Sequence, residues 1–183
     1  MKRQILFVQG GGEGVHDEWD NKLVESIERN LGPDYEIRYP RMPNEADPSY
    51  ARWKAALADE IAALDEGAFL IGHSVGGTIL IHALAESPPE RTIAGIFLIA
   101  APFVGPGGWR SDDIEAKPDL GARLPPRTPI SLYYGSRDET APLAHADLYE
   151  KAIPGATVRR LPGRDHQLDN DLAEVAEDVR ALV

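Results

Sequence analysis

Residues 69–84 read FLIGHSVGGTILIHAL, and this stretch decides the fold. An apolar run stops at Gly72, and a second apolar run with a helical pattern follows Gly-His-Ser-Val-Gly. The polar corner between two buried segments has two interpretations. It is either ordinary turn chemistry, with Ser74 as a helix N-cap, or a sharp turn that presents the Ser74 hydroxyl. The rest of the chain has to decide between them.

Short apolar runs alternate with helical patterns along the whole chain. Runs such as ILFV, FLI and GIFLIA are almost continuously apolar, which is typical of parallel strands covered on both faces. We expect strands at 4–9, 36–41, 68–72, 94–100, 129–134 and 157–161. We expect helices at 19–30, 48–65, 75–86, 141–151 and 170–182. This order predicts an α/β fold with a doubly wound, mostly parallel sheet in a single domain, 1–183.

Two connections have informative compositions. Asp47 is suited to cap the helix expected at 48–65, and Pro48 would then stand at the first helical position. The segment 103–127 is rich in proline, glycine and charge and is too long for a simple connection. Loops of this kind in compact domains are often functional, so we expect 103–127 to form a small lid-like loop.

Composition excludes several classes of function. The 19 basic and 30 acidic residues leave a net charge of −11, which repels phosphate backbones. The absence of cysteine excludes disulfides, thiolate catalysis and cysteine-based zinc sites. The apolar run from Ile5 to Val8 is too short for a signal-peptide core or a membrane span. We therefore expect a cytoplasmic protein that binds neither nucleic acid nor membrane.

Three residues with complementary chemistry follow predicted strands. Ser74 follows the third strand, Asp138 the fifth and His166 the sixth. Ligands of open α/β sheets bind at the carboxyl ends of the strands, so the three side chains are expected at one edge. A serine hydroxyl needs a base to become a good nucleophile, histidine is such a base near neutral pH, and an acid orients the imidazole.

The corner at 72–76 fits the G-x-S-x-G nucleophile elbow, a strained turn between a strand and a helix. Its glycines leave room where a side chain would collide with the neighbouring strand or helix. Because the next helix begins at the serine, its first N–H groups are free and favour developing negative charge. The N–H of Val75 is therefore a natural oxyanion donor.

These features together resemble the α/β-hydrolase fold, and most of all its small, nearly lidless retinoblastoma-binding-protein-like serine hydrolases. The resemblance covers essentially the whole chain. It is carried by GHSVGG at 72–77, QGGGEGVHDEW at 9–19, GSRDETAP at 135–142 and GRDHQL at 163–168. It implies the strand order 2-1-3-4-5-6, with Ser74 as nucleophile, His166 as general base and Asp138 as orienting acid.

The same resemblance implies that the loop after the first strand supplies the second oxyanion N–H, from Gly11 or alternatively from Gly12. Many members have His-Gly at this point, whereas here Gln9 and Gly10 stand there. A glutamine side chain can still form hydrogen bonds that hold the loop.

The position of the acid has alternatives, because some family members carry it after the preceding strand. Asp112 and Asp113 are the candidates there. We favour Asp138, because its strand end is sharper and a helix start follows at 140–142. Asp165, beside His166, is expected to be structural.

Other residues near the predicted edge have weaker assignments. Four of them are expected to contact a substrate: His16, His73, Phe103 and Trp109. In the helix after the elbow, His82 is expected to be partly buried with its hydrogen bonds satisfied. His145 is expected on the surface. Carboxylates near 170 are typical of a helix N-terminus, so no metal is expected.

The sequence thus predicts a cofactor-free serine hydrolase that cleaves an ester, thioester or amide of a small acyl substrate, with short-chain esters favoured. The non-enzymatic alternative is an interaction protein on a hydrolase scaffold. A dinucleotide site is rejected, because the third glycine of G-x-G-x-x-G would fall at Val15 or Asp17. A Walker phosphate loop is also absent. The sequence does not determine the oligomeric state.

Overall fold

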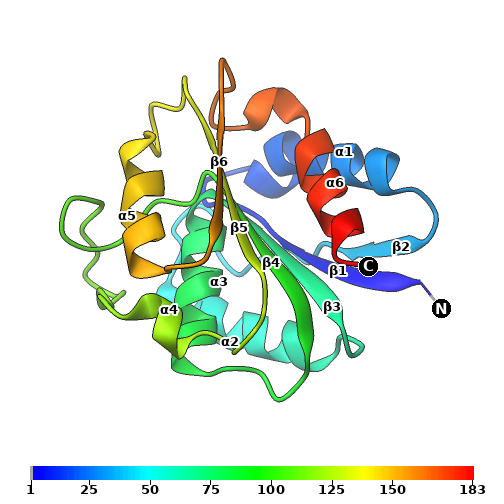
Figure 1. Ribbon diagram of the computed structural model, residues 1–183, viewed down its shortest axis with the longest axis horizontal. Coiled ribbons are helices and arrows are strands. Elements are labelled where there is room, and N and C mark those ends of the chain that lie inside the picture. The colour runs from blue at the N-terminus through cyan, green and yellow to red at the C-terminus, as the bar shows by residue number, and fades with distance from the viewer. Residues whose placement is uncertain (1) are drawn as a thin grey trace.

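The structure is a computed structural model that describes residues 2–183, and it contains one sheet of six parallel strands (Figure 1). The strands are β1 (Arg3–Val8), β2 (Tyr35–Arg38), β3 (Ala68–His73), β4 (Ile93–Ile99), β5 (Ile130–Gly135) and β6 (Thr157–Leu161). Their order is β2-β1-β3-β4-β5-β6, and every neighbouring pair is parallel. The predicted strand number and strand order are both confirmed.

Helices cover both faces of this sheet (Figure 1). They are α1 (Asn21–Leu31), α2 (Tyr50–Ala62), α3 (Ser74–Glu86), α4 (Leu120–Arg123), α5 (Ala144–Ala152) and α6 (Ala173–Ala181). A π-helical turn η1 (Val15–Asp20) precedes α1, and a 3-10 turn η2 (Leu168–Asn170) precedes α6. Across residues 2–183, no helix combines the length and apolar character needed to cross a bilayer.

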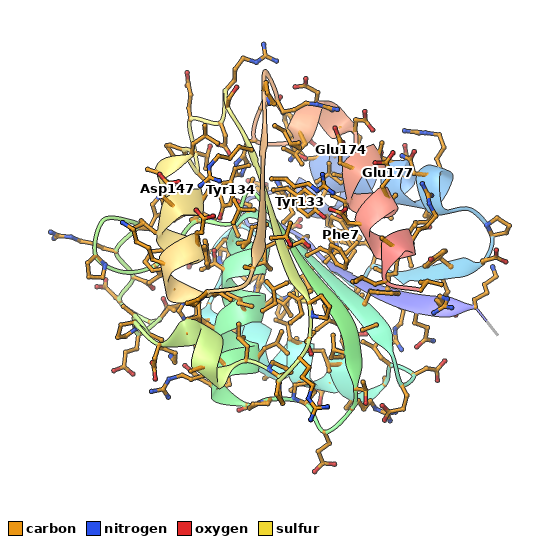
Figure 2. All side chains as sticks on the ribbon, viewed as in Figure 1. Phe7, Tyr133, Tyr134, Asp147, Glu174 and Glu177 are labelled. Atoms are coloured by element: carbon orange, nitrogen blue, oxygen red, sulfur yellow. The ribbon has the colours of Figure 1, made fainter. Side chains whose placement is uncertain are left out.

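Alternating strand residues build two separate cores. On β5, Tyr133 belongs to the core under α1 and α6, whereas Tyr134 belongs to the core under α2, α3 and α5. Figure 2 shows the two tyrosine side chains on opposite sides of β5, with Phe7 on the Tyr133 side. Successive side chains of a strand point to opposite faces, so a central strand covered on both sides must be apolar at every position.

The start of α2 differs from the sequence prediction. The helix begins at Tyr50 with Ser49 as its N-cap residue, so the prediction that Asp47 caps it and Pro48 opens it was wrong. Instead, Asp113 accepts a hydrogen bond from the Tyr50 N–H at 3.0 Å. A cap delivered by a residue far along the chain leaves no local signal in the sequence.

The segment 103–127 is also less irregular than expected. It contains the short helix α4 and an isolated bridge between Val104 and Trp109. Leu120 and Leu124, on and just after α4, are buried in the core under α2, α3 and α5. Phe103, Val104 and Ile114 belong to the same core, so both ends of the segment are anchored to the body of the protein.

His82 does not have the satisfied hydrogen bonds that the sequence predicted. Its side chain on α3 is 1% exposed, and neither ring nitrogen has a hydrogen-bond partner among residues 2–183. Burial lowers the pKa of His82 to about 4, and the nearby Lys117 ammonium acts in the same direction. The ring is therefore a neutral component of the core at physiological pH.

The pKa of His82 predicts a pH-dependent loss of stability. Unfolded His82 binds a proton near its usual pKa of about 6.5, and the folded protein binds it only near 4. Stability from this group is complete above pH 6.5 and falls as the pH drops towards 4. His82→Leu should remove about 2 kcal/mol of the stability difference between pH 7 and pH 5, at roughly 1.4 kcal/mol per pKa unit. Urea unfolding at both pH values measures this. Equal pH slopes in the two proteins would contradict it.

Candidate active site

Ser74 lies at the tight corner where β3 passes directly into α3. Its φ of 52° is in the left-handed region, which is strained for a residue with a side chain. Neighbouring glycines make the turn possible. A Cβ added at Gly72 would lie 2.6 Å from the Gly77 Cα, and one added at Gly76 would lie 1.9 Å from the Gln9 carbonyl oxygen. This is the geometry of a nucleophile elbow, which lifts the serine above the sheet edge.

The structure brings Ser74, His166 and Asp138 into one hydrogen-bonded chain. The Ser74 hydroxyl lies 2.9 Å from His166 Nε2, and Asp138 Oδ2 lies 2.8 Å from His166 Nδ1. Ser74 is the first residue of α3, Asp138 follows β5, and His166 lies in the loop after β6. A base between a hydroxyl and an acid is the arrangement that activates a serine nucleophile.

Asp138 is held as a carboxylate by its surroundings. Its side chain is fully buried, and Oδ1 accepts the backbone N–H groups of Thr140 and Ala141, both at 2.8 Å. Burial alone would raise the pKa of Asp138, but the His166 ring and these N–H groups hold it below its usual value. Of the alternative acids, Asp113 instead accepts the first N–H of α2, and among residues 2–183 neither Asp112 nor Asp113 is hydrogen-bonded to His166.

Backbone contacts align the two loops that carry the acid and the base. Arg137 N–H donates to the Arg164 carbonyl at 2.9 Å, and Ser136 N–H donates to the Leu161 carbonyl at 3.0 Å. A Cβ added at Gly135 would lie 2.2 Å from the Arg164 carbonyl oxygen. The backbones therefore touch, and the distance between Asp138 and His166 is set by main-chain contacts.

Two free amide groups lie beside the elbow. Within residues 2–183, the N–H groups of Gly11 and Val75 have no hydrogen-bond acceptor, whereas Gly10 donates to Asp20 and Gly12 donates to the Glu45 carbonyl. A Cβ added at Gly11 would lie 2.8 Å from Val75 Cγ1, so the two segments are in contact. Paired free N–H groups of this kind can bind an oxyanion.

Gln9 supports the loop that carries Gly11. Its buried side chain accepts the Met42 N–H at 3.0 Å and donates to Glu45 Oε2 at 2.6 Å. The same carboxylate accepts the His16 N–H at 3.0 Å. The glutamine thus ties the loop after β1 to the segment after β2, as the sequence predicted for this side chain.

The two histidines expected to contact substrate are occupied by protein groups. The His16 ring stacks on Tyr39 with centroids 4.1 Å apart, and its nitrogens face Asp17 and the Tyr39 carbonyl. The His73 ring is buried, and its nitrogens face Asp20 and the His166 carbonyl. Neither ring has a free nitrogen to offer a ligand.

The aromatic candidates in the segment 103–127 differ from one another. Phe103 is buried with its ring edge-on to Tyr149, whereas Trp109 is 40% exposed and lies edge-on to His145. The prediction that His145 is a surface residue was wrong, because its ring is buried and Nδ1 accepts the Phe103 N–H at 2.7 Å. His145 therefore anchors the start of the loop that presents Trp109.

Asp20 is the site residue that sequence reasoning missed. It is fully buried and accepts hydrogen bonds from Gly10, His73 and Gln167. In the sequence it is the last acid of HDEWD, just before a helix, where a solvated charge is the ordinary expectation. Asp165, by contrast, only accepts N–H groups of its own turn, as expected. Over residues 2–183, no group of three or more histidine and acidic side chains is placed to hold a metal ion.

Comparison with known proteins places the chain among hydrolases. Its residues 6–152 match the family described as serine hydrolase. An esterase from Rhodococcus sp. has a TM-score of 0.73 at 17% identity, covering 98% of this chain and 90% of the other. A monoacylglycerol lipase from Paleococcus ferrophilus has a TM-score of 0.69 at 17% identity, covering 98% of this chain and 95% of the other. At these identities the likeness concerns the fold. No curated protein matches the sequence.

Proposed function

This chain belongs to the serine hydrolase family, and we propose that it cleaves an ester of a small acyl substrate through a covalent acyl-enzyme. The observation that carries the proposal is the hydrogen-bonded chain from Ser74 through His166 to Asp138, beside two free N–H groups. Several of the structural neighbours are esterases or a lipase, which supports an ester as the substrate. Thioesters and amides can be cleaved through the same acyl-enzyme steps.

The first half of the reaction forms the acyl-enzyme. Ser74 Oγ attacks the substrate carbonyl carbon while His166 Nε2 takes the hydroxyl proton, and Asp138 stabilises the resulting imidazolium. The carbonyl oxygen becomes an oxyanion, which the N–H groups of Gly11 and Val75 bind. When the tetrahedral intermediate collapses, the C–O bond to the alcohol breaks and His166 gives its proton to the leaving oxygen.

The second half releases the acid. A water molecule loses a proton to His166 and attacks the acyl carbon, and the same N–H groups bind the second oxyanion. Collapse breaks the bond to Ser74 Oγ, and His166 returns the proton to that oxygen. Because α3 begins at Ser74, the positive end of its dipole also favours both oxyanions.

A fluorophosphonate probe tests the nucleophile. The probe should label the intact protein covalently, and Ser74→Ala should abolish labelling, because Ser74 carries the one hydroxyl within residues 2–183 that is hydrogen-bonded to His166. Ser87→Ala, at the other end of α3, is the matched control and should label as the wild type does. Gel fluorescence or intact mass measures the outcome. Labelling that survives Ser74→Ala, or no labelling of the wild type, would disprove the proposal.

Two substitutions test the acid. Asp138→Asn should lower kcat/KM by about 10³–10⁴-fold, because an amide cannot stabilise the imidazolium or maintain the tautomer. Asp113→Asn, whose carboxylate caps α2, should keep kcat/KM within about twofold. Kinetics with p-nitrophenyl acetate compare the two variants. Wild-type turnover in Asp138→Asn would remove it from the mechanism.

We further propose that the single domain carries a lid-like segment, 103–127, that forms one wall of the acyl site. The Pro102 carbonyl accepts the Thr78 hydroxyl at 2.6 Å, one turn into α3 from Ser74, so the segment leaves the sheet close to the nucleophile. Buried Phe103 and exposed Trp109 would supply apolar surface there. His16 would lie near the opposite side, on the loop of Gly11.

Trp109 provides the test of this wall. Trp109→Ala should lower kcat/KM progressively as the acyl chain of p-nitrophenyl esters lengthens, by up to about tenfold, because each buried methylene contributes about 0.8 kcal/mol. The acetate ester should be almost unaffected. A uniform change along the ester series would show that Trp109 does not contact the acyl chain.

A further inference from the structure

Asp20 connects the three segments on which the proposed mechanism depends. Its Oδ2 accepts the Gly10 N–H at 2.7 Å and faces His73 Nδ1 at 2.9 Å, and its Oδ1 accepts the Gln167 side chain at 3.1 Å. Gly10 precedes the oxyanion donor, His73 precedes the nucleophile, and Gln167 follows the general base. A fully buried carboxylate at this junction is costly unless its charge is paired and its oxygens are hydrogen-bonded.

The His73 ring has an acceptor on each side. Its Nδ1 faces the Asp20 carboxylate at 2.9 Å, and its Nε2 faces the His166 carbonyl oxygen at 3.0 Å. A carbonyl oxygen can only accept, and a neutral imidazole has only one N–H. When Asp20 is ionised, it can only accept as well, so both contacts are hydrogen bonds only if both ring nitrogens carry a proton. The geometry then makes the ring an imidazolium.

The surroundings of Asp20 place the negative charge on this carboxylate. Two further N–H donors, from Gly10 and Gln167, point at its oxygens and stabilise the ionised form. Burial alone would raise the pKa of Asp20, but His73 and these donors hold it below its usual value. Burial alone would lower the pKa of His73, but Asp20 raises it. The other titratable groups that face His73 are His166 and Asp138.

We propose that Asp20 and His73 form a permanent buried ion pair that positions the general base and the oxyanion loop. The positioning role rests on the proposed function, whereas the charge of His73 does not depend on it. The His73 imidazolium holds the backbone carbonyl of His166, and Asp20 holds Gln167 and Gly10. The two are positioning residues, and His73 supports the site from behind rather than binding substrate.

The charge of His73 can be observed directly. In ¹⁵N-labelled wild-type protein, both His73 ring nitrogens should remain protonated from pH 6 to pH 8, where an unperturbed histidine with a pKa of about 6.5 becomes neutral. Comparison with His73→Gln assigns the signals. The measurement needs no substrate. A His73 ring that loses one of its protons within this range would overturn the ion pair.

Asp20→Asn tests the positioning role. Asparagine keeps an acceptor for Gly10 but lacks the charge, so His73 should become neutral at pH 7 in the same spectra. The variant should lose about 10- to 100-fold in kcat with KM changed less than about threefold, as is typical for residues that orient a reacting group. Asp178→Asn is the control, since its carboxylate contacts Tyr133 and Arg159 and none of the three segments. It should keep wild-type kcat.

The outcomes separate this inference from the proposed function. An unlabelled Ser74 with a cationic His73 would disprove the hydrolase mechanism and leave the ion pair established. A labelled Ser74 with unchanged kcat in folded Asp20→Asn would disprove the positioning role. Circular dichroism shows whether Asp20→Asn folds, and if it does not, the wild-type spectra alone decide the charge of His73.

Discussion

The contact between the backbone of α3 and the ends of β1 and β3 is the constraint on which the site depends. Gly76 approaches the Gln9 carbonyl so closely that no Cβ fits, and Gly72 and Gly77 touch in the same way. These contacts hold the first turn of α3 against two strands at once. As a result, the strained Ser74 and the free Val75 N–H lie beside Gly11. Packing of this density tolerates no added atom without displacement.

The site contains two aspartate–histidine pairs, Asp138–His166 and Asp20–His73, whose surroundings differ. Asp138 and His166 sit with the ring reaching the Ser74 hydroxyl, so the imidazole has one nitrogen free to exchange a proton. Asp20 and His73 lie behind them, with the centroids of the His73 and His166 rings 5.0 Å apart. Every polar side-chain atom of Asp20 and His73 faces a protein partner. The first pair suits proton transfer, and the second suits a fixed charge.

The strands and most helices were predictable because each follows from local chemistry. Continuous apolar runs mark strands covered on both faces, and their ends placed Ser74, Asp138 and His166 at one edge. The cap of α2 was not predictable, because Asp113 reaches Tyr50 across 63 positions of sequence. The burial of His145 also depends on a distant partner, the Phe103 N–H, which no periodicity of its own helix reveals.

By itself the sequence determined the strands and the chemical types at the edge of the sheet, because these depend on apolar periodicity, glycine spacing and a recognisable elbow. The strand order came from the resemblance to α/β-hydrolases. The tertiary structure alone decided which carboxylate meets which imidazole. Three aspartates of the sequence have different partners in the fold. Asp138 contacts His166, Asp113 accepts the first N–H of α2, and Asp20 is buried against His73. The reason is physical: the state of a buried charge depends on the partners that surround it in space, and those partners come from segments far apart in the chain.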